Sequence, residues 1–546
     1  MMNRELSAYA VAIRRARSRH RWSRPRLAYE LEQVIKREGK EPPGRESLIR
    51  MVRAWENGEH KPDDYNRERL AKALGSALDD GFEINQTRPA GVITPSSSAR
   101  KLKAIEFVAW IAKHSNLSFQ GVYEAVSARA EWLDAQAPAT RFAQAHERSR
   151  ITREQIAKAL VAYYGDVSTG NTGAKFYKAR VGGTPLTLTI TTKRGWLGMA
   201  VQLGSDQERF RLNSDPVVGA PVSPLVETTL EAALLRLASV EVSDTVLVNN
   251  PLYQLLDIAI ARHHLEAVVS VAHFADYALT MDLLETELMD ALVATRQPFA
   301  VPNLTNAVTK LPLRDAYLPT MTSALTLNRR LCVGGPVALL AVARNSARHG
   351  QREPDFVLLI QERSARVVNV TGKIAVVPKS FHAPTVEAGE EVPLSASLER
   401  ELEEELLGRE DLECLLDGSS RRADPFHTDH LSEPMRWLVD RRCTDAYRVE
   451  CLGFGINMVT GNYEFPCLIM IDDEEWWARY GGQVEANWEM ERIRRYSSRD
   501  TVGLQTLIAD PQWSNEGLFA FLEGLRRLAE LDTVSRLALP ALEVEV

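Results

Sequence analysis

Residues 400–408 read Arg-Glu-Leu-Glu-Glu-Glu-Leu-Leu-Gly, and this short run is the most informative stretch of the chain. Positions three and four apart share one face of an α-helix, so Glu401, Glu404 and Glu405 can converge on one cation. Mg²⁺ prefers oxygen ligands and keeps water or substrate phosphates as its remaining ligands. The run therefore predicts a helix with three candidate metal-binding carboxylates, and Mg²⁺ is the cofactor it would hold.

The same run resembles the signature helix of the Nudix hydrolases, R-E-U-x-E-E-x-G-U, in which U is an aliphatic residue. Arg400, Glu401, Glu404 and Glu405 match it. The resemblance implies an α/β/α sandwich. In an active member it also implies a Mg²⁺ ion that clamps a diphosphate while water attacks.

The chain departs from the full Nudix signature around this helix. Val386 and Val392 occupy the positions of an expected glycine and glutamate, and Gly408 falls one place late. The strand-to-helix loop shapes the diphosphate pocket of the family, so these departures favour a domain that binds a nucleotide-type small molecule without hydrolysing it. The alternatives are a working hydrolase and an ordinary solvated helix, in which Arg400 and Glu404 form an i,i+4 pair.

The amino-terminal segment has the opposite charge to the rest of the chain. Up to Gly75 it holds 18 lysines and arginines against 11 acidic residues, a net charge of +7, whereas the whole chain carries −7. A basic head on an acidic body is expected when one module faces a polyanion such as double-stranded DNA.

Four elements of this basic segment occur in the order found in XRE-type, phage-repressor-like helix-turn-helix domains. They are Ile13-Arg14-Arg15-Ala16-Arg17, Trp22-Ser23-Arg24-Pro25-Arg26-Leu27-Ala28, Ala54-Trp55-Glu56-Asn57-Gly58-Glu59-His60-Lys61-Pro62 and Leu70-Ala71-Lys72-Ala73-Leu74-Gly75. The resemblance implies a DNA-recognition helix that ends near Gly58, although the segment between Leu31 and Trp55 is longer than the family's tight turn. The candidate DNA contacts are Arg24, Arg26, Arg45, Ser47, Arg50 and Arg53. A basic helical module that binds protein is the alternative.

At 546 residues the chain exceeds one hydrophobic core, and we expect a multidomain α+β protein. The expected order is an all-α helix-turn-helix domain at 1–75, a linker at 76–99, a helical connector at 100–165, a mixed α/β regulatory region at 166–333 and a Nudix-like α/β/α sandwich at 334–546. The connector can pair two chains, so a homodimer whose heads read two half-sites is expected.

Apolar periodicity predicts the individual elements of the larger part. Alternation predicts a hairpin of strands 176–181 and 185–192, and further strands at 356–361, 373–377, 447–457 and 465–471. Helical spacing predicts helices at 225–237, 253–260, 275–294 and 515–531, with His263-His264 as the polar end of the second.

Several classes of protein are not favoured. No apolar run reaches the roughly 18–20 residues that a membrane-spanning helix needs, so no membrane partner is expected. The five cysteines include no C-x-x-C pair, which favours reduced thiols and a cytoplasmic location.

These patterns together favour a DNA-binding transcriptional regulator whose carboxy-terminal domain senses a small ligand. A Mg²⁺-dependent diphosphate hydrolase with a DNA-binding head is the alternative, and a protein-interaction scaffold is a third hypothesis.

Overall fold

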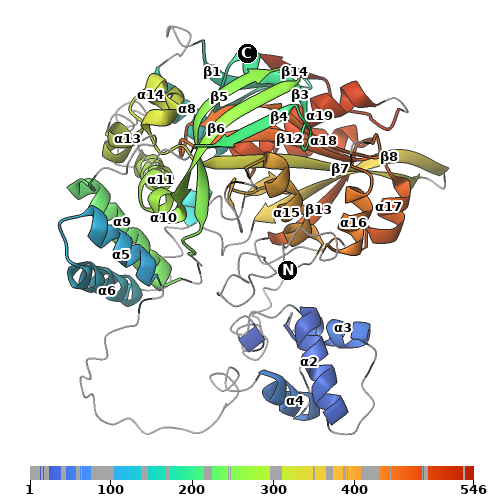
Figure 1. Cartoon of the computed structure of the whole chain (residues 1–546), viewed down its shortest axis with the longest axis horizontal. Coiled ribbons are helices and arrows are strands. Elements are labelled where there is room, and N and C mark those ends of the chain that lie inside the picture. Colours follow the sequence, from blue (N-terminus) through green and yellow to red (C-terminus); the bar gives the residue numbers. More distant parts are fainter. Residues whose placement is uncertain are drawn as a thin grey trace. The chain divides into compact units, whose positions relative to one another are not determined.

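The computed structural model contains two compact units, residues 1–99 and residues 100–546 (Figure 1). The residues described in the first unit are 13, 16–17, 24–37, 43, 45–56, 62 and 64–74. In the second unit the structure describes residues 102–546 except 103, 137–145, 166–172, 214–223, 244, 246, 296–309, 349–350, 364–372, 385–388, 390–391, 408–430, 443, 483, 485–489, 533–534 and 546.

The described part of the first unit is helical, as the sequence predicts. Its helices are α2 (Arg24–Arg37), α3 (Arg45–Glu56) and α4 (Asp64–Leu74). Apolar residues three and four apart on these helices face inward and form one small core. That core contains Ile13, Ala16, Leu27, Ala28, Leu31, Ile35, Leu48, Val52, Trp55, Leu70 and Leu74.

A buried carboxylate ties the helices of this unit together. Glu56 is fully buried, and it accepts hydrogen bonds from Arg17 Nε at 2.6 Å and from Arg24 Nε at 2.7 Å. Burial alone raises the pKa of Glu56, but the two guanidinium groups outweigh it, and the net pKa lies below its ordinary value of 4.5. The ionised form is therefore the one that the folded unit stabilises.

We predict that Glu56→Gln lowers the free energy of unfolding of the first unit by about 1–3 kcal/mol. The contribution of Glu56 is present above about pH 4.5 and is lost as the pH falls through its lower folded-state pKa. Hydrogen exchange of the full chain at pH 7 checks this, through faster exchange of the α2 and α3 amides. Glu32→Gln, which removes a surface pair with Lys36, serves as the control. Equal protection in both variants contradicts the prediction.

The second unit is built on one large mixed sheet. Its strands are β1 (Lys175–Val181), β2 (Thr184–Thr192), β3 (Leu197–Gln202), β7 (Gly334–Arg348), β8 (Gln351–Arg363), β9 (Ile374–Val376), β10 (Tyr447–Gly453), β11 (Gly455–Asn457), β12 (Tyr463–Ile471), β13 (Met490–Ser497) and β14 (Leu542–Glu545). The main order is β13-β8-β7-β12-β11-β2-β1-β14, with β10 beside β12 and β3, and β9 beside β8. At its centre β7 and β12 run parallel, with Gly334 to Val342 opposite Tyr463 to Ile471.

This sheet takes strands from both sides of residue 333. Strands β1, β2 and β3 precede that position, and β7 to β14 follow it. The expected limits at 165 and 333 therefore do not divide the second unit into separate compact bodies. Strands that are far apart in the sequence pair within this sheet, as β11 does with β2 and β10 with β3. No local sequence pattern reveals such pairings.

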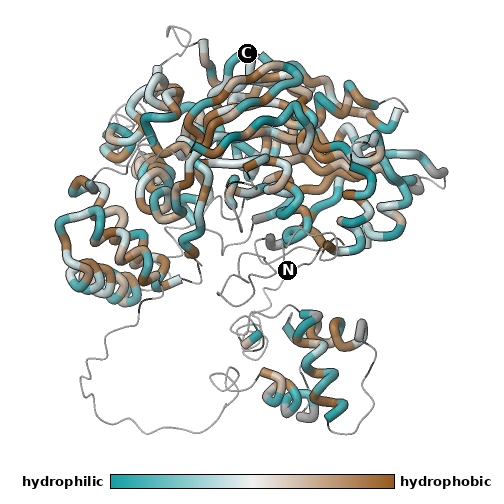
Figure 2. Tube along the Cα trace, in the orientation of Figure 1, coloured by the Kyte–Doolittle hydropathy of each residue, from teal (hydrophilic) through white to brown (hydrophobic). Residues whose placement is uncertain are grey.

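Helices cover the two faces of the sheet. Leu339 and Ala341 of β7 share a core with α18 (Thr501–Ala509) and α19 (Asn515–Leu531). The alternating residues Leu340 and Val342 share the other core with α15 (Leu394–Leu406), α16 (Glu433–Val439) and α17 (Glu474–Tyr480). Figure 1 shows α15, α16 and α17 grouped on one side of β7 and β8, and in Figure 2 the hydrophobic colour follows the sheet strands.

The second unit also contains a smaller sheet, in the order β4-β6-β5. Its strands are β4 (Glu208–Leu212), β5 (Pro251–Ala261) and β6 (His264–His273). The helices are α5 (Ile105–His114), α6 (Phe119–Ala135), α8 (Arg153–Tyr164), α9 (Glu227–Glu241), α10 (Phe274–Asp276), α11 (Leu283–Thr295), α13 (Pro312–Tyr317) and α14 (Met321–Leu325), with a π-helical turn, η4 (Tyr277–Met281), and 3₁₀ turns η3 (Arg194–Trp196) and η5 (Leu327–Arg329). No helix within the described ranges is both long and apolar enough to cross a membrane.

Most predicted elements are confirmed, including the hairpin at 176–192 and the helix at 515–531. The helix predicted at 253–260 is wrong, because these residues belong to β5, which pairs along its length with β6. The expected helix end at His263-His264 is wrong for the same reason. These histidines lie at the β5–β6 turn, and His263 Nδ1 contacts Ala200 O at 3.0 Å.

Candidate functional site

The exposed face of α3 carries three of the predicted DNA-contacting residues. Arg50 and Arg53 are exposed and Ser47 is half-buried, and Arg50 Nη2 donates to Ser47 Oγ at 3.3 Å. Positions three apart lie on one side of a helix, while Leu48 and Val52 turn inward to the core. The predicted side chains are therefore held together on a solvent-facing surface of α3.

The other three predicted DNA contacts are Arg24, Arg26 and Arg45, and they do not belong to the group on the exposed face of α3. Arg26 is exposed on α2, pairs with Glu30 at 2.8 Å and lies over the Tyr29 ring at 5.3 Å. Arg24 binds the buried Glu56 and so contributes to the stability of the unit. Arg45 is the first residue of α3, and its side chain lies outside the described residues.

The acidic helix α15 is buried, which excludes the solvated surface helix. Arg400 is 2%, Glu404 7% and Glu405 1% exposed. The helix packs beneath β7 through apolar residues that include Leu398 and Leu402. The buried charged side chains, Arg400, Glu403, Glu404 and Glu405, must therefore be satisfied mainly by the protein.

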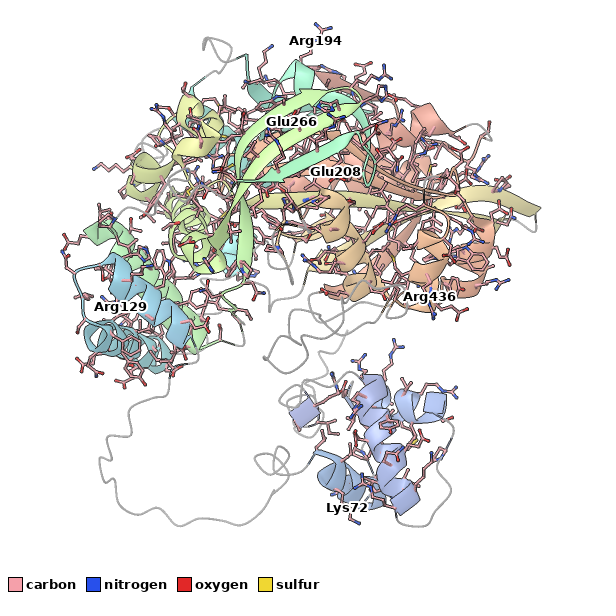
Figure 3. The ribbon with its side chains drawn as sticks, viewed as in Figure 1. Lys72, Arg129, Arg194, Glu208, Glu266 and Arg436 are labelled. Atoms are coloured by element: carbon pink, nitrogen blue, oxygen red, sulfur yellow. The ribbon has the colours of Figure 1, made fainter. Side chains whose placement is uncertain are left out.

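A carboxylate from the second sheet fixes the start of α15. Glu208 of β4 accepts hydrogen bonds from the backbone N–H of Leu394 and Ser395 and from Ser395 Oγ at 3.0 Å. It also accepts from Gly204 N at 2.8 Å. Figure 3 labels Glu208 on its strand. Burial raises the pKa of Glu208, and these hydrogen bonds counteract part of that shift. A side chain from the middle of the chain thus caps the helix that carries the Nudix-like run.

Other glutamates of α15 hold neighbouring segments. Glu403 accepts from Ser432 N at 2.6 Å and from Ser432 Oγ at 2.7 Å, which fixes the start of α16, the helix of the labelled Arg436 (Figure 3). Glu399 pairs with Arg442 at 2.5 Å. Glu405 Oε2 accepts from Lys379 N at 3.2 Å. The helix therefore uses several of its carboxylates as internal hydrogen-bond acceptors.

The structure places two of the three predicted metal ligands, Glu401 and Glu405, against protein groups. Glu405 bonds a backbone amide, and Glu401 lies 3.6 Å from Arg400 Nη2. Within the ranges that the structure describes, no group of three or more His, Cys, Asp or Glu side chains is placed to hold a metal ion. The prediction of Mg²⁺ bound by Glu401, Glu404 and Glu405 is not confirmed.

The loop that leads into α15 is anchored by a buried histidine. His382 Nε2 contacts Val392 O at 2.7 Å and Nδ1 contacts Tyr463 Oη at 3.1 Å. Burial lowers the pKa of His382 to about 3, so the ring is neutral near pH 7. Val392, which stands where the Nudix signature has a glutamate, is 2% exposed and packs in the core. Val386 lies outside the described residues.

An interior acidic group, which sequence reasoning missed, lies at the start of α19. It consists of Glu285, Glu464, Glu516 and Lys379. Lys379 Nζ pairs with Glu516, and Asn457 Nδ2 donates to Glu516 at 3.3 Å. Burial raises the pKa of Glu285 and Glu464, whereas Lys379 outweighs burial and lowers that of Glu516. The members come from α11, β12, α19 and the segment that follows β9, so no sequence spacing signals them.

No protein-family model matches this chain. No curated protein matches it at a significant level of similarity either.

We predict that Glu208→Gln destabilises the second unit by about 1–3 kcal/mol, because an amide cannot replace every bond that the carboxylate accepts. Urea unfolding of the full chain, followed by circular dichroism, measures the change. Glu266→Gln is the matched control, since within the described residues the ion pairs of Glu266 are those with exposed Arg211 and half-buried His264 on the same small sheet (Figure 3). Equal midpoints for the two variants contradict a capping role for Glu208.

Proposed function

We propose that this protein is a DNA-binding transcriptional regulator, with an XRE-type helix-turn-helix head and a Nudix-like body that senses a small ligand. The observation that carries the proposal is the group of exposed Arg50, exposed Arg53 and half-buried Ser47 on α3, which packs on a small helical core. A rigid helix that presents arginines and a hydroxyl to solvent supplies donors for base edges and phosphates.

The boundaries of α2 and α3 support the proposal of a helix-turn-helix domain in the first unit. Helix α3 begins at Arg45 and ends at Glu56, so the residues expected at the recognition helix lie on a single element. The longer segment after Leu31 is taken up by an α2 that runs to Arg37 and by the connection before Arg45. The motif order and the helix order therefore agree.

The body supports ligand sensing more than hydrolysis. Its sheet has α15 on one face and α19 on the other, a layering consistent with the Nudix-like resemblance. The carboxylates of α15 cap and tie neighbouring segments, and such a helix can report a change in its surroundings without turning over a substrate.

We predict that Arg50→Ala and Arg53→Ala each weaken binding of the full chain to duplex DNA by roughly tenfold. Each change is also expected to reduce the slope of log affinity against log salt by about 1 if the arginine contacts a phosphate. Fluorescence anisotropy over a salt series measures both quantities.

Arg129→Ala provides a control, because Arg129 lies on α6 in the second unit and pairs with Glu231 (Figure 3). It removes the same charge and should leave the affinity unchanged. Equal losses in all three variants would show a nonspecific charge effect and contradict a role for α3.

A second prediction concerns the alternative function. The full chain should release no phosphate or nucleotide from a panel of nucleoside di- and triphosphates in Mg²⁺, because the α15 carboxylates bond protein groups. The control is Glu475→Gln, because Glu475 is an exposed residue of α17. Turnover that this control retains, and that Glu404→Gln and Glu405→Gln abolish, would establish the hydrolase and overturn the sensor proposal.

A further inference from the structure

Two buried cysteines face each other across neighbouring strands of the large sheet. In the antiparallel pairing of β10 with β12, Cys451 lies directly opposite Cys467. Residues that are directly opposite in an antiparallel pair point to the same face of the sheet. Both thiols are free and fully buried, and both belong to the core that α15 also enters. The register of the strands therefore brings the two thiols together in the interior.

The hydrogen bonds of the backbone define the kind of pair that the two cysteines form. Asp472 N donates to Ala446 O at 2.9 Å, which places the bonds between β10 and β12 at the even-numbered residues of β10. Val449 O instead accepts from Leu203 N at 2.9 Å, so the odd-numbered residues of β10 direct their backbone groups toward β3. Hydrogen-bonded and non-hydrogen-bonded pairs alternate along an antiparallel ladder, so the two cysteines form a non-hydrogen-bonded pair.

A non-hydrogen-bonded pair has the spacing that a disulfide needs. The Cα atoms of such a pair are about 4.5 Å apart, and its side chains lie closer together than those of a hydrogen-bonded pair. Disulfides join residues whose Cα atoms are about 4.4–6.8 Å apart. A bond between Cys451 and Cys467 is therefore compatible with the pairing of β10 and β12, and the strands need not separate to hold it.

In the reduced protein the two thiols have only weak partners. Cys451 Sγ donates to Gly453 O at 3.4 Å, and Cys467 Sγ donates to Phe465 O at 3.3 Å. Burial raises the pKa of Cys467, and the neighbouring Cys451 thiol and the negative charge of Glu208 raise it further. The Cys467 thiol is therefore protonated near pH 7, and its oxidation in the folded protein is slow.

We propose that Cys451 and Cys467 are a redox modification site, at which a hydroperoxide converts the two thiols into a cross-strand disulfide. One thiol attacks the peroxide as its thiolate and becomes a sulfenic acid, with release of water. The other thiol then attacks that sulfur and displaces a second water molecule. In total, two thiols and one molecule of hydrogen peroxide give one disulfide and two molecules of water.

The oxidant follows from the burial of the pair. Hydrogen peroxide is close to water in size, so a small local opening of the strands admits it, whereas oxidised glutathione needs a much larger one. The disulfide closes the loop formed by residues 452–466, which contains β11. Neither cysteine lies on α3 or on α15, so the inference does not rest on the proposed function.

Oxidation of the folded full chain with dilute hydrogen peroxide tests the site. Free thiols are then alkylated in denaturant, and the chain is digested with a protease that cleaves after glutamate. Cleavage at Glu450, Glu464 and Glu474 places the two cysteines on separate fragments, 451–464 and 465–474. We expect these fragments to stay linked until dithiothreitol is added. Fragments that are never linked, or that link only when the chain is unfolded before oxidation, overturn the proposal.

Variants that circular dichroism shows to be folded assign the bond to this pair. Cys332→Ser is the matched control, because Cys332 is also free and fully buried in the same core, and it should form the link as the wild type does. In Cys451→Ala the thiol of Cys467 has lost its partner, so the intact protein should no longer lose the mass of two hydrogen atoms on oxidation. Cys467→Ala gives the same test if Cys451→Ala does not fold. A loss of two hydrogen atoms in these alanine variants, as large as in the wild type, contradicts the proposal.

Discussion

The burial of α15 is the constraint on which the rest of the second unit depends. The helix carries five glutamates, of which Glu403, Glu404 and Glu405 are buried and Glu399 and Glu401 are partly buried. Buried carboxylates are tolerated when donors surround them, so other segments must supply those donors. Ser432 and Lys379 do so, and Glu208 caps the start of the helix from the small sheet. One acidic helix thereby joins the middle of the chain to its carboxy-terminal part.

The burial of α15 bears on the role of the carboxylates in residues 400–408. In a catalyst, carboxylates converge on a cation and keep positions open for substrate. Here Glu405 bonds a backbone amide, and Val392 packs in the core where the family signature has a glutamate. Several of the carboxylates of this run serve the connections between segments. A domain of this kind can transmit the binding of a ligand, provided that the ligand favours one state over another.

Local periodicity predicted much of the fold, because it reports one element at a time. The hairpin with Gly182-Gly183 and the helix at 515–531 carry their own turn and spacing signals. The prediction at 253–260 was wrong because its apolar residues suit either a helix or a strand. Pairing with β6 makes this segment a strand. Glu208 and Glu403 were unpredictable for a related reason: their roles depend on contacts between distant segments.

In the proposed function, the basic unit binds DNA and the acidic unit binds the ligand. The small basic unit presents arginines on α3, and the large acidic unit holds the buried polar groups on which a ligand can act. The most direct test is a genome-wide DNA-binding footprint of the wild-type chain beside an Arg50→Ala/Arg53→Ala double variant. We predict discrete occupied sites for the wild type and their loss in the double variant. Absence of discrete sites, or occupancy that the double variant leaves unchanged, would contradict the account.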